Sequence, residues 1–138
     1  MKNLAKTSSI LAMAIMIFAA SVNTYADNRV DKTVEKARSI ITDCSPDDWE
    51  SYAKAADMCI RKQVNLTEAK TWLDKSLTIK ESALGHEVAG DYYMSSKLYK
   101  KAADHYIKSM MKIKEKDNSA QLSDLQAKVN NAIVKSKE

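Results

Sequence analysis

The side chains that most often carry chemistry are few in this chain and far apart. His86 and His105 are its two histidines, and no histidine or cysteine pair has the i, i+4 spacing that places two metal ligands on one helix face. We expect His86 to pack between helices and His105 to face outward. Asp47 and Asp48 are adjacent and diverge on a helix, and neither a phosphate-binding loop nor a nucleophile motif occurs. The sequence therefore offers no catalytic constellation and predicts a protein that is not an enzyme.

Cys44 and Cys59 could form a disulfide if the chain is exported to an oxidising compartment. Residues 46–61 are expected to form one helix, and its rise of ~1.5 Å per residue places Cys59 roughly 20 Å from the helix start. A disulfide needs α-carbons within about 7 Å of each other, so Cys44 would have to fold back along the helix. The alternatives are a buried Cys59 that acts as a small hydrophobic residue and an exposed or intermolecular thiol at Cys44.

No cofactor is expected. The chain lacks the Cys-x-x-Cys-His sequence that attaches haem covalently. Met110 and Met111 follow His105 closely, so a small helical bundle that carries haem or a metal ion through His and Met is an alternative function. Methionines at helical spacing more often fill the core.

The first 26 residues have the pattern of a secretory signal peptide. Lys2 and Lys6 precede an apolar run at residues 10–20, and Thr24-Tyr25-Ala26 suits cleavage after Ala26. The run is shorter than the ~20 residues that cross a bilayer. We therefore expect a signal peptide at 1–26 and one domain at 27–138, periplasmic or secreted by a bacterium, without stable membrane insertion after cleavage.

Cleavage would also remove much of the apparent basicity. The full chain has 22 basic and 18 acidic residues, and the signal segment holds two of the basic residues and no acid, which leaves a net charge of +2. The lysines between 97 and 116 alternate with Asp104, Glu115 and Asp117, as on a solvated helix face. No dense basic patch suited to nucleic acid is present.

Only two glycines and one proline occur, and the composition favours an all-α fold. Apolar spacing predicts six helices, at 29–42, 46–61, from 65, 84–95, 98–114 and from 118. Ser45 is expected to cap the second helix, and Asn65 with Glu68 resembles a capping box at the third.

One sequence pattern occurs twice, 33 residues apart. Residues 65–77 align with residues 98–110, which places Ala69 on Ala102 and Leu73 on Tyr106. Two antiparallel helices approach closely where a small residue meets a large ring. The residues expected at such contacts are Ala69, Leu73, Gly90, Tyr93, Tyr99, Ala102, Tyr106 and Ser109.

This pattern resembles the tetratricopeptide repeat, most clearly from residue 83 to residue 114, although His86 stands where that family has tryptophan. Residues 49–73 are also similar to the helical tail of some bacterial exported proteins of unknown function. The resemblance implies two antiparallel helical hairpins flanked by an N-terminal and a C-terminal helix. It implies no catalytic activity.

The resemblance also implies a concave surface lined by the first helix of each hairpin. The exposed residues expected there form one basic and one acidic wall: Lys54, Met58, Arg61, Lys62, Leu84, Glu87, Asp91 and Met94. Such a groove would hold a protein or peptide of mixed charge, so we expect a non-catalytic scaffold or chaperone-like protein of the bacterial envelope. Because two repeats fall below the usual minimum of ~3, a structural homo-oligomer is a further alternative.

Overall fold

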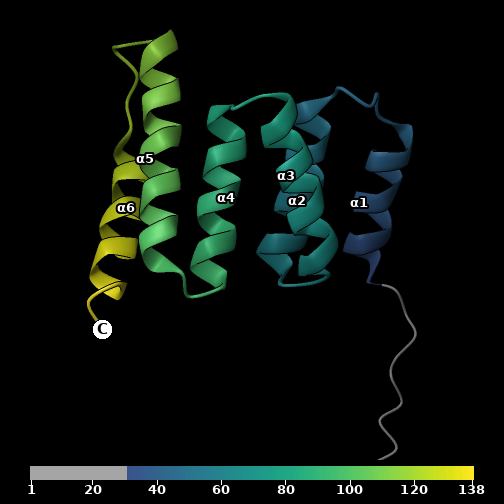
Figure 1. Ribbon diagram of the computed structural model, residues 1–138, viewed down its shortest axis with the longest axis horizontal. Coiled ribbons are helices and arrows are strands. Elements are labelled where there is room, and N and C mark those ends of the chain that lie inside the picture. Colours follow the sequence, from purple (N-terminus) through teal and green to yellow (C-terminus); the bar gives the residue numbers. More distant parts are fainter. Residues whose placement is uncertain (1–30) are drawn as a thin grey trace, which may run out of the picture.

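Six α-helices make up residues 31–138, the part of the chain that this computed structural model describes. They follow one another across the molecule from α1 to α6, with α2 behind α3 in the view of Figure 1. Their bounds are α1 (Lys32–Asp43), α2 (Trp49–Lys62), α3 (Leu66–Ile79), α4 (Ala83–Ser95), α5 (Tyr99–Lys116) and α6 (Ser123–Lys135). The expected signal peptide and its cleavage site lie outside the described residues, as does the expected helix start at Arg29.

The helices pack as two antiparallel hairpins. The most extensive contacts join α4 to α5 and α2 to α3, while α1 packs against α2 and α6 against α5. No strand occurs in residues 31–138. The predicted all-α class, with helical hairpins between two flanking helices, is confirmed.

Two helices begin later than their apolar spacing predicts. The carboxylate of Asp48, and not Ser45, caps α2 by accepting the backbone N–H of Ser51 at 3.1 Å. The α6 helix begins at Ser123 and not at 118, because the amine of Lys114 donates to loop carbonyls at 2.7 and 2.9 Å. Side-chain bonds to the backbone compete with helix formation, and here they hold residues 117–122 outside the helix.

The turns inside the two hairpins share one backbone conformation. Gln63 and Lys97 both have a left-handed φ, of 56° and 58°. The next residues, Val64 and Leu98, each donate an N–H to the carbonyl five residues earlier, at 3.0 and 2.8 Å, as in a Schellman motif. The matching residues of the two turns are 34 positions apart in the sequence. The matching residues of α3 and α5 are only 33 apart, because the first turn contains one additional residue, Asn65.

Asn65 does not form the expected capping box. It takes a left-handed conformation with φ 47° and its side chain accepts no bond from the helix backbone. Its amide instead donates to the carboxylate of Glu68 at 2.9 Å.

One buried hydrogen bond recurs in both hairpins. The hydroxyl of Ser76 donates to the carbonyl of Trp49 at 2.7 Å, and that of Ser109 donates to the carbonyl of Ala83 at 2.8 Å. Trp49 and Ala83 are the first residues of α2 and α4, and both serines are fully buried. Each bond therefore joins the second helix of a hairpin to the start of the first.

Replacing either serine with alanine should remove this bond. We expect Ser76→Ala and Ser109→Ala each to lower the free energy of unfolding by about 1 kcal/mol, the net value of one intramolecular hydrogen bond. Urea denaturation measures the change. Ser39→Ala, at an exposed position on α1, is the matched control and should stay within about 0.5 kcal/mol of the unaltered protein; a loss as large as that of the buried serines would contradict the prediction.

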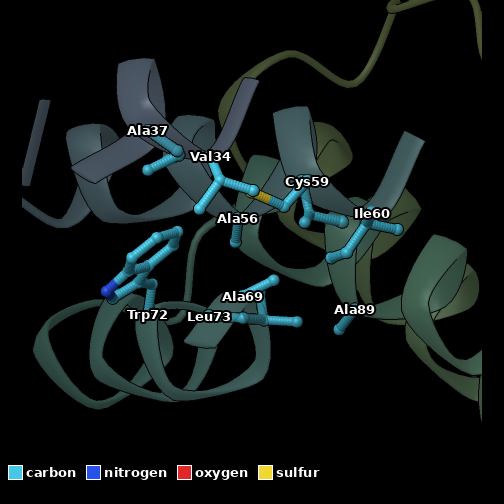
Figure 2. Close-up of a cluster of buried hydrophobic side chains, with 11 residues drawn as sticks. Val34, Ala37, Ala56, Cys59, Ile60, Ala69, Trp72, Leu73 and Ala89 are labelled. Atoms are coloured by element: carbon cyan, nitrogen blue, oxygen red, sulfur yellow. The ribbon is translucent and has the colours of Figure 1, made fainter. Parts of the chain in front are cut away.

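The core consists of two apolar clusters. The first lies among α1 to α4, where Figure 2 shows side chains of all four helices together. The second lies between α5 and α6. Tyr93 packs against both clusters. The buried members of the first are Val34, Ala37, Ala55, Ala56, Cys59, Ile60, Ala69, Trp72, Leu73, Val88 and Ala89; those of the second are Ala102, Ala103, Tyr106, Leu122, Leu125 and Ala132.

The closest approach between α4 and α5 is at Gly90. A β-carbon at this position would lie less than 3.0 Å from three ring atoms of Tyr106, a side chain that is 2% exposed. The corresponding residues of the first hairpin are Ala56 and Leu73, both buried. In the second hairpin the small residue is smaller, glycine in place of alanine, and the large residue is larger, tyrosine in place of leucine. Tyr99, the last residue of the expected contact set, is half-buried near the ammonium of Lys135.

Candidate functional site

An open groove of about 660 Å³ lies among α2, α4 and α6. The end of α2 and its turn form one side, α4 forms the middle, and α6 forms the other side. Its lining residues are Ile60, Arg61, Gln63, Glu87, Asp91, Met94, Ser95, Asp124 and Lys128.

The structure brings together half of the residues predicted for the groove. Arg61, Glu87, Asp91 and Met94 line it. Four others do not: Lys54 is exposed and pairs with Glu50 on α2, Leu84 packs against the first core cluster, and Met58 and Lys62 lie outside the lining.

For the three of these residues that lie on α2, the reason is the extra residue Asn65. The prediction applied the 33-residue offset to the first helices, but α2 and α4 match at 34. At that offset Ile60 corresponds to Met94 and Arg61 to Ser95, and all four line the groove. An error of one residue turns a helix face by about 100°, so Lys54, Met58 and Lys62 were assigned to the wrong side of α2.

Lys128 was not among the predicted groove residues, yet it lines the groove and joins its two carboxylates. Its Nζ donates to Glu87 at 2.8 Å and to both carboxylate oxygens of Asp91 at 3.0 Å. It lies three residues after Leu125 and four before Ala132, both of which are buried. A lysine on the apolar stripe of a helix was the signal that could have found it.

Tyr106 completes this network from the core side. Its hydroxyl donates to Asp91 at 2.7 Å, and the ammonium of Lys128 lies 5.4 Å from its ring centroid. Burial and the bond to Asp91 raise the pKa of Tyr106 far above its ordinary value. Burial alone would lower the pKa of Lys128, but its bonds to Glu87 and Asp91 outweigh this and raise it. Both groups are therefore protonated at neutral pH, and the carboxylates share one bound cation.

Arg61 supplies the second cation of the groove. Its guanidinium donates to Asp57 at 2.8 Å, one turn earlier on α2. That bond raises the pKa of Arg61, and the charges of Asp91 and Glu87 across the groove contribute further. Asp57 is the counterpart of Asp91 at the 34-residue offset. The groove thus presents charges of both signs beside the apolar atoms of Ile60 and Met94.

The two histidines meet between α4 and α5. His86 is 2% exposed and His105 is half-buried, so the expectation that His105 faces outward is wrong. Their Nδ1 atoms are 3.2 Å apart, and the ring of Tyr93 lies beside that of His105. Within residues 31–138, no group of three His, Cys, Asp or Glu side chains is arranged to hold a metal ion.

Cys44 and Cys59 are both free thiols in the structure. Cys59 is fully buried in the first core cluster, where burial raises its pKa. Cys44 is half-buried and its thiol contacts the carbonyl of Ile41 at 3.4 Å.

No helix of the described part is both long enough and apolar enough to cross a bilayer.

The lining of the groove suits binding. It offers paired charges, two amide or hydroxyl groups and an apolar floor, the mixture by which open surfaces hold extended peptides. In comparisons with known proteins, no family model, curated protein or solved structure matches the chain.

Proposed function

We propose that this protein binds an extended segment of another protein in the groove among α2, α4 and α6, without catalysing a reaction. The observation that carries the proposal is the groove itself, about 660 Å³ and lined by charged, polar and apolar side chains of three helices. Together with the signal peptide expected from the sequence, it favours a scaffold or chaperone-like role in the bacterial envelope.

The internal repeat supports this function. In the tetratricopeptide repeat, the first helices of successive hairpins line a concave peptide-binding surface, and here α2 and α4 stand in that relation. The matching turns and the recurring serine bonds agree with two copies of one hairpin. By the same comparison, α6 stands where the first helix of a third hairpin would be.

The side chains that line the groove would have different roles in binding. Met94 is flexible and polarisable, so it adapts to apolar side chains of different shape. The exposed guanidinium of Arg61 would steer and select partners more than it would add affinity. The Lys128 network is partly buried and would hold the acidic wall in place.

Site-specific photo-crosslinking in the native host tests the proposal. A photo-reactive residue at position 63, in the groove, should capture a protein partner, while one at position 75, on the exposed surface of α3, should not. Equal capture from both positions would remove the groove as the binding site. Capture of a second copy of this chain from position 63 would instead support the homo-oligomer.

Charge reversal at Arg61 gives a quantitative test with the captured partner. We expect Arg61→Glu to weaken binding about tenfold, or about 1.4 kcal/mol, because it places an acid beside Glu87 and Asp91. Lys54→Glu reverses an exposed lysine of the same helix outside the groove and is the matched control. Fluorescence anisotropy measures both dissociation constants, and an equal loss in the two variants would show that only overall charge matters.

A further inference from the structure

His86 and His105 are the only histidines of the chain, and the fold brings their rings into contact between α4 and α5, tilted by 44°. Their Nδ1 atoms are 3.2 Å apart and their ring centroids 5.3 Å apart. A neutral imidazole has one N–H donor and one acceptor nitrogen. One Nδ1 therefore carries the proton of this contact and the other accepts it.

We propose that the His86–His105 pair makes the α4–α5 hairpin acid-sensitive, because protonation of both rings sets two N–H donors against each other and forces the helices apart. An imidazolium has no acceptor nitrogen. The bond at 3.2 Å would become a contact between two positive charges. His86 is 2% exposed and is enclosed between α4 and α5, at the base of a small pocket that Lys108 and Lys112 also line. The repulsion would therefore displace His105 and weaken the packing of α4 against α5.

The surroundings add to this sensitivity. Burial lowers the pKa of both histidines; for His105 the charge of His86 is the next cause, and nearby lysines lower both values further, while Glu81 and Asp104 oppose them. The charged and titratable groups that face the pair are Lys70 from α3, Glu81 from the loop before α4, Tyr93 from α4, and Asp104, Lys108, Lys112 and Glu115 from α5.

The direction of the pH effect follows from linkage. The folded protein binds protons at this pair less readily than the unfolded chain, whose histidines have a pKa of about 6.5. The stability that the neutral pair contributes is therefore fully present above that pH and is lost as the pH falls through the lowered values.

The same helices carry the contacts next to the groove. Gly90 lies one turn after His86, and Tyr106 follows His105 directly. Separation of α4 from α5 would therefore disturb the Gly90–Tyr106 contact and the bond from Tyr106 to Asp91. This inference does not depend on what the groove binds.

Hydrogen exchange of the unaltered protein and of His105→Gln tests the inference. Glutamine keeps a donor and an acceptor but does not titrate. Between about pH 7.5 and about pH 5, after correction for intrinsic exchange rates, amides of α4 and α5 should lose about tenfold more protection than amides of α2 and α3. In His105→Gln this excess loss should disappear.

Three results would overturn the inference: an equal loss in both hairpins, the same excess loss in the glutamine variant, or ordinary imidazole titration. The last is measured by NMR on the unaltered protein and needs no variant. Both imidazoles should titrate below about 6.5. If His105→Gln does not fold, His86→Gln replaces it, with the same expected loss of the pH effect.

Discussion

Gly90→Ala should lower the free energy of unfolding by about 2–3 kcal/mol, although alanine favours a helix over glycine by about 1 kcal/mol. The new β-carbon would lie less than 3.0 Å from three atoms of the Tyr106 ring. That ring is 2% exposed and its hydroxyl is bonded to Asp91 at 2.7 Å, so it has no free space into which to move. To relieve this clash α4 has to move away from α5, and the loss of packing between the two helices lowers the stability.

Gly85→Ala is the matched control in the same helix. A β-carbon at Gly85 would approach the terminal methyl of the Leu77 side chain, at 2.8 Å. A flexible side chain can shift at low cost, whereas the bonded ring cannot. We expect a change of less than about 1 kcal/mol for Gly85→Ala, measured by urea denaturation, and equal losses at the two glycines would contradict the explanation.

The first hairpin suggests a compensating change. Its corresponding residues are Ala56 and Leu73, so the double variant Gly90→Ala/Tyr106→Leu transfers that pair into the second hairpin. Tyr106→Leu alone should cost about 2–3 kcal/mol through lost packing and a lost hydrogen bond. The double variant should be more stable than the sum of the two single changes by about 1–2 kcal/mol. Simple additivity would show that the two positions do not share one packing constraint.

Asp91→Ala should also cost about 2–3 kcal/mol. It removes the acceptor of the Tyr106 hydroxyl and one of the two carboxylates that hold the ammonium of Lys128. Tyr106 is 2% exposed, so its hydroxyl would be left without an acceptor, and the ammonium of Lys128 would keep only Glu87. Thermal or urea unfolding at neutral pH measures the loss.

Two other substitutions define the cause of that loss. Asp91→Asn keeps an acceptor for Tyr106 but removes the charge that Lys128 requires, so its effect should be intermediate. Asp57→Ala removes the counterpart of Asp91 in the first hairpin, where the partner is the exposed side chain of Arg61. Exposed i, i+4 pairs contribute little, and we expect less than about 0.5 kcal/mol. An effect at Asp57 as large as that at Asp91 would contradict the role of burial.

Much of the fold could be predicted because its determinants are local. Apolar residues at helical spacing, together with the scarcity of glycine and proline, predicted six helices and an all-α class. The alignment of Ala69 with Ala102 and of Leu73 with Tyr106 was visible because each pair occupies the same face of α3 and α5. All four of these residues are buried.

The face that each helix turns toward its neighbours could not be predicted in the same way. Asn65 adds one residue to the first turn, and its left-handed conformation shows in the backbone but not in the spacing of apolar residues. Three of the predicted groove residues, Lys54, Met58 and Lys62, were therefore placed on the wrong face of α2. The start of α6 was missed as well, because the spacing of apolar residues does not report the bonds from the Lys114 amine to the carbonyls of Asn118 and Ala120.

The sequence by itself determined which residues form helices, which faces are apolar and that two hairpins share a pattern. Only the tertiary structure decided that His86 meets His105 and that Lys128 joins Glu87 and Asp91. These partners are 19 to 41 residues apart. Periodicity fixes the direction of a side chain relative to its own helix, whereas turn geometry and packing fix which helix it faces.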